Sequence, residues 1–216
     1  MKGLLLAALV ALAVPALGES EPLVHVEYTN PALVPGHWTL EVHPDGSAHF
    51  VSQRGNAARL EGQGIEPPDV NRDFQLSPKF AERIFEIARR KKLFHVECES
   101  HFKVAYQGTK KLAYSGPDGQ GSCEFNYSKD TEIQTLGDDL VSVANTIVEG
   151  ARLQSLLLHD RLGLDRETEI LTESAADGRA QQIGSIREIL ERLAEDDSVL
   201  ERVRRRARAL LDRAQN

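Results

Sequence analysis

Two cysteines are the first side chains in this sequence whose type can do chemistry. Cys98 and Cys123 are the only cysteines among 216 residues, and an even count suits a disulfide. Alternating apolar residues around each of them point both thiols into one core. We therefore predict a Cys98–Cys123 disulfide, which requires an oxidising compartment. Two free thiols, or a metal-binding or catalytic cysteine, are the alternatives.

Histidines and a glutamate form the second candidate site. The polar face of a predicted β-hairpin carries His37, Glu41, His43 and His49. Glu41 then lies opposite His49, with His43 near the turn. Imidazole and carboxylate groups bind zinc or copper, so the candidate metal ligands are Glu41, His43 and His49. The same residue types are also common on a solvated sheet face that binds no metal.

The motifs of well-known catalytic sites are missing from the chain. The sequence contains no GxSxG, HExxH, CxxC or GxxxxGK[ST] pattern. We therefore predict no catalytic residues and no cofactor, and the sequence favours a protein that is not an enzyme. The alternative is a metal-dependent or other hydrolase that uses the His37/Glu41/His43/His49 face, because acids and bases can converge from distant positions.

The first residues have the pattern of an export signal. A lysine precedes the uninterrupted apolar stretch Leu4–Val14, which is too short to span a bilayer as a helix. Small residues at Ala16 and Gly18 suit signal peptidase, so we predict a signal peptide over 1–18 and cleavage before Glu19. We expect the mature protein in the periplasm or outside the cell, without stable insertion in a membrane.

The charge of the chain disfavours nucleic acid as a partner. Thirty-three acidic residues outweigh 26 basic ones for a net charge of −7, and removal of Lys2 with the signal makes the mature chain more acidic. An arginine-rich stretch near the C-terminus runs against this average. Its arginines are Arg202, Arg204, Arg205, Arg206, Arg208 and Arg213. We expect them to face water or acidic neighbours; an acidic partner or anionic lipid is the alternative.

Apolar residues recur with period two through most of residues 23–128. Leu23–Thr29 is predicted to be a strand whose inner face carries Val24, Val26 and Tyr28. Strands at 37–43 and 47–51 flank Pro44-Asp45-Gly46, which suits a hairpin turn with a bulge. The facing pairs in that hairpin are Val42 with Ala48, Leu40 with Phe50, and Trp38 with Ser52.

The following segment is predicted to contain a loop, one helix and three strands. Residues 54–76 are rich in Gly, Pro, Asn and Asp and predict a long irregular loop. Ser77 is the expected N-cap of a helix over 78–93, with Pro78 at its first position. A turn at 107–109 is expected to join strands at 102–106 and 110–114, and a further strand carries Cys123, Phe125 and Tyr127 on one face.

From about Asp130 the apolar period changes to that of α-helices. The first helix runs to about His159 and is expected to end at Gly163; its stripe is Ile133, Leu136, Leu140, Val143, Ile147 and Ala151. Asp165 is the expected N-cap of a second helix. Two more helices cover 183–193 and 200–210, and the short connections predict antiparallel packing.

Together these elements predict an α+β fold. We expect an antiparallel β-sheet packed on one helix, followed by a C-terminal bundle of about four α-helices. The predicted division is a signal peptide at 1–18, a β-rich domain with one helix at 19–129, and a helical hairpin region at 130–216.

The last two helices resemble a HEAT-type helical hairpin. The resemblance covers residues 186–211 and rests on the acidic turn Glu195-Asp196-Asp197, the Val203-Arg204 step and the small alanines that follow. It implies a surface for another protein. The N-terminal half is similar to small exported bacterial sheet-plus-helix domains of unknown function, which implies no activity. The sequence thus predicts an exported, non-catalytic protein-interaction module whose partner is another protein.

Overall fold

A six-stranded antiparallel sheet and five α-helices make up the computed structural model, which describes residues 21–55 and 67–214. The predicted signal peptide lies outside the described residues. The strands run in the order β4-β3-β2-β1-β5-β6 across the sheet. Their bounds are β1 Leu23–Thr29, β2 His37–Val42, β3 Ser47–Gln53, β4 Val70–Gln75, β5 Thr109–Gly116 and β6 Gly119–Phe125. The α+β class is therefore confirmed.

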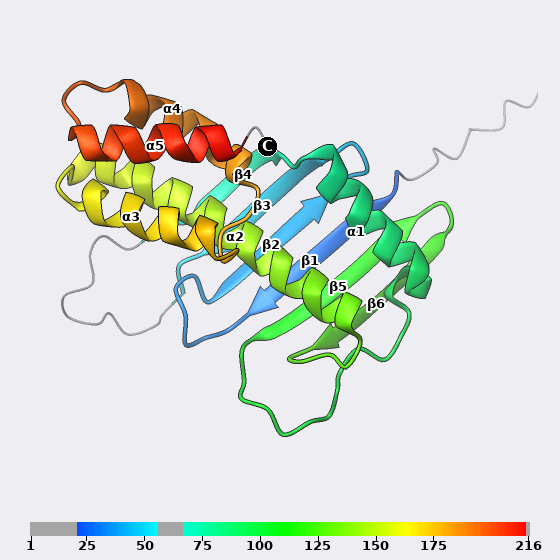
Figure 1. The fold of residues 1–216 in the computed structure, drawn as a ribbon. Helices are drawn as coiled ribbons and strands as arrows, with labels where there is room; N and C mark the ends of the chain where they lie inside the picture. The colour runs from blue at the N-terminus through cyan, green and yellow to red at the C-terminus, as the bar shows by residue number, and fades with distance from the viewer. Residues whose placement is uncertain (1–20, 56–66, 215–216) are drawn as a thin grey trace, which may run out of the picture.

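Two helices cover one face of the sheet, and the remaining helices lie beyond its edge (Figure 1). The helices are α1 Pro78–Arg90, α2 Thr131–His159, α3 Gly163–Ala176, α4 Arg187–Glu195 and α5 Glu201–Arg213, with short 3-10 turns at Lys92–Phe94 and Ile183–Ile186. α1 and α2 lie across the sheet, and the second half of α2 runs past it to meet α3, α4 and α5. None of the described helices is long and apolar enough to cross a membrane.

The first strand and the β2–β3 hairpin confirm the period-two prediction. Val42 pairs with Ala48, and Leu40 with Phe50, in the expected register. The Asp45 carboxylate accepts a hydrogen bond from the Ser47 N–H at 2.8 Å, which closes the turn. Gly46 has a φ of 84°, a conformation that glycine adopts without strain. Local turn chemistry therefore fixes which side chains enter the core.

Strand β4 corrects the prediction of an irregular loop over 54–76. Val70–Gln75 forms the edge of the sheet and pairs with β3. On this strand only Val70 is fully buried, so the apolar alternation that identifies a strand is nearly absent. Pairing with the well-defined β3 makes it a strand, and that pairing is a tertiary effect.

The predicted strand at 102–106, with its hairpin to 110–114, is wrong. β5 pairs with β1 on one side and with β6 on the other, so both of its hydrogen-bonding edges are occupied. Residues 101–108 therefore form no strand, and the alternating apolar side chains of Phe102, Val104 and Tyr106 are exposed. β6 ends at Phe125, before the predicted Tyr127.

Helix starts and ends show smaller corrections. α1 starts at Pro78 as predicted, but the Ser77 side chain makes no capping hydrogen bond, and the helix ends at Arg90 because Lys92 and Leu93 take positive φ. α2 ends at His159, as expected, whereas Gly163 opens α3 instead of closing α2. Asp165 consequently lies in the first turn of α3 and is not its N-cap.

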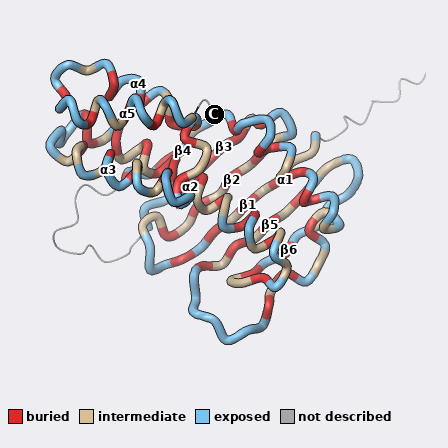
Figure 2. Tube along the Cα trace, in the orientation of Figure 1, coloured by how far each residue is buried: buried red, intermediate tan, exposed pale blue. Residues whose placement is uncertain are grey.

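Two hydrophobic cores share α2. The first lies between the sheet and the two covering helices and includes α2 residues from Ile133 to Val148. The second lies among α2, α3, α4 and α5 and includes α2 residues from Leu153 to Leu157. Buried positions accordingly follow the whole length of α2 (Figure 2). The boundary between the two cores thus lies within α2, between Val148 and Leu153, whereas the predicted division of the chain begins the helical region at residue 130.

The predicted disulfide is present in the first core. Cys98 and Cys123 are bonded, with their Cα atoms 5.7 Å apart, and both are buried. Cys123 lies on β6, and Cys98 lies in the irregular segment that follows α1. The Ser100 N–H donates to the Tyr127 carbonyl at 2.9 Å, which places this segment beside the end of β6. The disulfide therefore ties a segment without regular structure to the edge of the sheet.

Replacing both cysteines should destabilise the protein. The bond joins residues 25 apart in sequence, and closing a loop of that length lowers the entropy of the unfolded chain by an amount equivalent to about 3 kcal/mol. We expect Cys98→Ala/Cys123→Ala to lower the free energy of unfolding by about that amount in urea titrations. Wild-type protein reduced with a thiol reagent is the control and should lose a similar amount; equal stability of oxidised and reduced wild type would contradict the argument.

Candidate functional site

The histidine face predicted from sequence is present on the side of the sheet that no helix covers. Glu41 pairs with His49 across β2 and β3, as expected. However, the side chains have other partners. His49 Nδ1 lies 2.6 Å from an Asp73 carboxylate oxygen on β4, and His25 Nδ1 lies 3.5 Å from Glu41 Oε1. His37 similarly lies 3.1 Å from Glu27.

These pairs spread over the open sheet face and do not converge on one point. Among residues 21–55 and 67–214, no three histidine, cysteine, aspartate or glutamate side chains are grouped as metal ligands. His43 stands apart at the end of β2, and its Nδ1 is buried without a hydrogen-bond partner in the described chain. The structure thus gives the residues of this face pairwise contacts of the kind found on solvated sheets.

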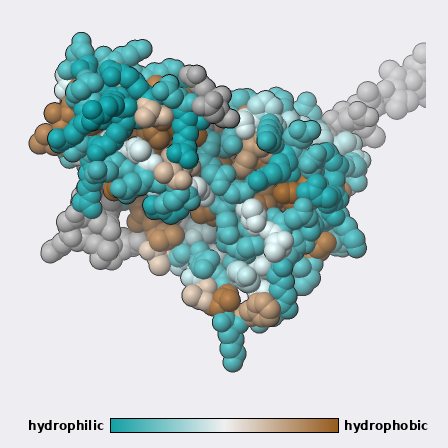
Figure 3. All heavy atoms as spheres, viewed as in Figure 1, coloured by the Kyte–Doolittle hydropathy of each residue, from teal (hydrophilic) through white to brown (hydrophobic). Residues whose placement is uncertain are grey.

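An exposed aromatic segment lies where the sequence predicted a strand with a buried apolar face. Residues 100–106, named here the aromatic segment, leave large parts of Phe102, Val104 and Tyr106 exposed: 56%, 41% and 57%. Figure 3 shows apolar atoms gathered beside this projecting part of the chain. Large apolar side chains exposed this close together form a patch of the kind that occurs at interaction sites.

Hydrogen bonds hold the aromatic segment at both ends. The Glu99 carboxylate accepts from the Asn126 N–H at 2.7 Å, and Asn126 Oδ1 accepts from the Gln107 N–H at 2.7 Å. The Tyr106 hydroxyl donates to the Thr29 carbonyl at 3.0 Å. With the Cys98 disulfide at its start, the segment is anchored to β1 and β6 and presents its side chains in a defined arrangement.

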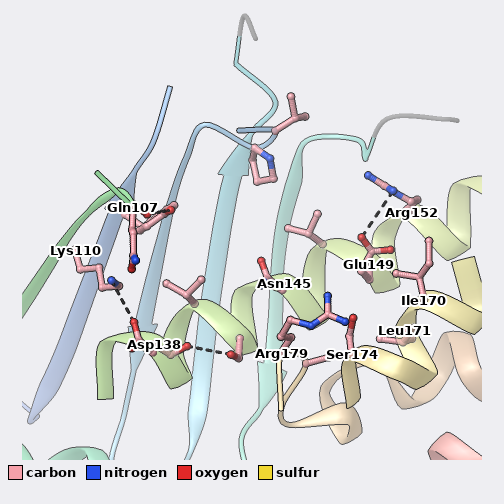
Figure 4. Close-up of a pocket in the computed structure, with 17 residues that line it drawn as sticks. Gln107, Lys110, Asp138, Asn145, Glu149, Arg152, Ile170, Leu171, Ser174 and Arg179 are labelled. Carbon is pink, nitrogen blue, oxygen red and sulfur yellow. Dashed lines mark hydrogen bonds and ion pairs between the residues drawn. The ribbon is translucent and has the colours of Figure 1, made fainter. Parts of the chain in front are cut away.

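A polar stripe on α2 is the second feature that the sequence reasoning missed. Its residues step by four, three, four and three positions, so they share one helix face beside the apolar stripe: Asp138, Ser142, Asn145, Glu149 and Arg152. This spacing is visible in the sequence and could have been found there. All five residues line a cavity of about 450 Å³ (Figure 4).

The walls of this cavity, named here the α2 cavity, come from distant parts of the chain. Tyr28 and the loop containing Val34 and Pro35 form the sheet side. Ile170 and Ser174 of α3 face α2 from the other side, and Arg179 lies beyond the end of α3. The size of the cavity is in the range of small-molecule sites, but its lining is mixed, with polar and charged side chains as numerous as apolar ones.

At the α3 end of the α2 cavity, the lining residue Arg152 lies between two carboxylates, of which Glu149 lines the cavity and Glu167 lies behind Arg152. Arg152 Nη1 lies 3.9 Å from Glu149 Oε1 and 3.3 Å from Glu167 Oε2. Burial raises the pKa of Glu149 to about 7; the positive charge of Arg152 opposes this shift, and the nearby Glu167 carboxyl adds to it. Near neutral pH the Glu149 carboxyl is therefore partly protonated, unlike an ordinary glutamate.

Two buried polar atoms at this end lack a fixed partner. Arg152 Nε has no hydrogen-bond partner among the described residues, and Glu149 Oε2 meets no fixed donor there, although the protonated Glu149 carboxyl hydrogen-bonds with Glu167. A buried polar atom without a partner is costly, and a ligand can supply the missing hydrogen bond.

At the opposite end of the cavity, Lys110 is a buried cation with its charge satisfied. Its ammonium lies 3.2 Å from Asp138 Oδ1 and 5.5 Å from the centre of the Phe125 ring. Beside it, the Tyr28 hydroxyl donates to the Gln107 carbonyl at 2.7 Å, and burial raises the pKa of Tyr28. This end is therefore electrically balanced.

The arginines of α5 mostly have acidic partners within the chain. Arg202 and Arg206 both lie within 2.8 Å of an Asp165 oxygen, and Arg208 lies 3.2 Å from Glu201. Arg204 also contacts Asp197 and Glu201. The expected pairing with acidic neighbours thus accounts for much of this basic stretch.

Comparison with known proteins adds no assignment. No protein-family model matches the chain, and no curated protein matches its sequence. The function proposed below therefore rests on the exposed side chains of the aromatic segment.

Glu149→Gln should change how stability depends on pH. Because the folded state raises the pKa of Glu149 from 4.5 to about 7, folding favours the protonated form; this contribution is complete below about pH 4.5 and is lost as pH rises to about 7. Above that pH the ionised carboxylate costs up to about 3 kcal/mol. We expect Glu149→Gln to gain stability relative to wild type between pH 4.5 and pH 8, measured by urea unfolding.

Glu173→Gln is the matched control for this measurement. Glu173 is an exposed residue of α3, and its replacement removes the same charge outside the cavity. The stability difference between this variant and wild type should stay nearly constant over the same pH range. An equally flat result for Glu149→Gln would show that burial does not perturb its carboxyl.

Proposed function

We propose that this protein is exported to the periplasm or out of the cell and acts there as a non-catalytic protein-interaction module. The disulfide is consistent with an oxidising compartment, and the N-terminal sequence has the pattern of a signal peptide. The aromatic segment is the contact surface in this proposal, and its exposed side chains carry the argument.

The aromatic segment has the properties of an interaction hot spot. Aromatic side chains contribute large contact area, and a segment that is already anchored loses little conformational entropy on binding. The Phe102 ring lies 6.5 Å from the Tyr127 ring and 4.5 Å from the Lys129 ammonium. Phe102 and its neighbours therefore form a small aromatic surface bordered by positive charge.

Charge indicates which partner suits this surface. Lys103 lies within the aromatic segment and Lys129 beside it, whereas the chain as a whole carries a net charge of −7. A partner with an apolar patch and an acidic rim would match the aromatic segment. Contacts of such a partner with the rest of the acidic surface would add little to the binding free energy. Because the arginines of α5 largely pair within the chain, we place the contact at the aromatic segment and not at the HEAT-like helices.

Phe102→Ser/Val104→Ser should abolish partner capture without affecting folding. Both side chains are largely exposed, so the free energy of unfolding should change by no more than about 0.5 kcal/mol. Crosslinking of the mature protein in its native envelope or secretome, followed by quantitative mass spectrometry, should show at least a tenfold loss of one specific partner.

Leu158→Ser/Leu162→Ser is the matched control for this crosslinking experiment. These two leucines are also exposed, but they lie at the junction of α2 and α3, away from the aromatic segment. The control variant should keep the crosslinked partner. Retention of that partner by the Phe102/Val104 variant, or an equal loss in the control, would overturn the assignment of the contact surface.

A further inference from the structure

We propose that a second cavity, at the start of α1, binds a phosphate monoester, with the phosphate group held by Lys79, Arg213 and the first turn of the helix. This cavity, named here the α1 cavity, is separate from the aromatic segment and does not depend on the function proposed for it. The argument rests on the charge of the lining, on hydrogen-bond donors without partners and on a buried hydroxyl.

Three segments that are far apart in the chain form the α1 cavity. The end of β4 and the start of α1 meet the connection between α3 and α4, and the end of α5 lies on the third side (Figure 1). The Ser77 N–H donates to Gln182 Oε1 at 2.9 Å, which ties the start of α1 to this connection. The cavity has a volume of about 660 Å³, which is in the range of small-molecule sites.

Among the described residues, the charged side chains that line the α1 cavity are both cations. Lys79 belongs to the first turn of α1, and Arg213 to the last turn of α5. Neither forms an ion pair within the described part of the chain. Asp177 does not line the cavity, and its carboxylate lies 2.8 Å from Arg179. The lining therefore carries two positive charges that a dianion can neutralise, in a chain whose net charge is −7.

The start of α1 adds a backbone donor to these charges. The Ser77 side chain does not cap the helix, and the Phe80 and Ala81 N–H groups both donate to the Ser77 carbonyl, at 3.0 and 3.1 Å. The Lys79 N–H is left without an acceptor among the described residues. Because a helix is positive at its N-terminus and α1 has no acidic residue in its first turn, this end favours an anion.

A buried hydroxyl in the connection between α3 and α4 also lacks a partner. Ser185 lines the cavity and is only 6% exposed, and its Oγ makes no hydrogen bond within the described chain. A buried polar atom without a partner is costly, so a ligand that supplies one gains affinity. Gln182 lies beside it in the lining and uses its side-chain oxygen for Ser77, so its amide N–H groups remain as donors.

A phosphate monoester matches this combination of charges and donors. Its phosphate group carries close to two negative charges at neutral pH and three acceptor oxygens. These oxygens can accept from the two cations, the helix N–H and the Ser185 hydroxyl at the same time, and hydrogen bonds from charged donors are the stronger ones. A monocarboxylate offers half the charge and fewer acceptors. The neutral glutamine and serine side chains of the lining suit a polar body such as a sugar.

NMR titration of the full mature chain with glucose 6-phosphate tests the proposal. We expect saturable shifts of amide signals at the start of α1, in residues 182–185 and at the end of α5. Glucose has the same sugar without the phosphate group and should bind at least tenfold more weakly, because it cannot form the charge-assisted hydrogen bonds.

Variants separate the cavity from the general charge of the surface. Lys79→Gln/Arg213→Gln changes two exposed residues and should lower the affinity for glucose 6-phosphate at least tenfold, whereas Ser185→Ala should lower it about threefold. Arg192→Gln/Arg205→Gln is the matched control, because it removes the same charge from exposed positions outside the cavity, and it should bind as wild type does.

The amide spectrum without ligand checks that each variant is folded. Absence of saturable glucose 6-phosphate binding, or equally tight binding of glucose, would overturn the proposal. So would wild-type affinity in the folded Lys79→Gln/Arg213→Gln variant, or an equal loss of affinity in the control.

Discussion

The burial of one long helix in two cores is the constraint on which the rest of this structure depends. α2 has 29 residues and is therefore about 43 Å long, so it extends beyond the sheet that its first half covers. Its first half packs on the sheet, and its second half packs on α3, α4 and α5. The two parts of the molecule cannot separate without exposing apolar residues of a continuous helix, since no linker joins them.

Shorter contacts reinforce this arrangement at the junction. Thr146 Oγ1 donates to the Gln181 carbonyl at 2.7 Å, and Arg72 of the edge strand donates to the Ser185 carbonyl at 3.1 Å. Gln182 accepts from the Ser77 N–H at 2.9 Å, so the start of α1 is tied to the same connection. The segment between α3 and α4 thus touches the sheet, α1 and α2, and the α2 cavity lies beside it.

The aromatic segment and the α2 cavity both lie where neighbouring strands and helices do not fully cover the side chains of the chain. Between α1 and β5, residues 102–106 cannot form the hairpin with β5 that their alternation predicts, because both edges of β5 are occupied, and their apolar side chains remain outside the sheet. On α2, the face beside the apolar stripe passes from the sheet to α3, and neither covers it fully. Glu149 is consequently buried enough for its pKa to rise, yet it still lines an open cavity.

The sequence alone determined the elements whose signal is local. The turn at Asp45-Gly46 and the alternation on either side are enough to set the β2–β3 register, and the α2 stripe identifies its helix, because each depends on neighbours a few residues away. The disulfide followed from cysteine count and export pattern. The polar stripe through Glu149 was equally readable by spacing, but spacing does not reveal burial.

Only the tertiary structure decided the rest. Strand β4 exists because β3 offers an edge, and Phe102, Val104 and Tyr106 do not pair with β5 because β1 and β6 occupy both of its edges, although their pattern alternates more clearly. Burial of Glu149 depends on α3, and its charge environment on Arg152 and Glu167 together. The physical reason is that strand pairing, desolvation and charge balance are shared between segments far apart in the chain, whereas a sequence pattern reports on one segment at a time.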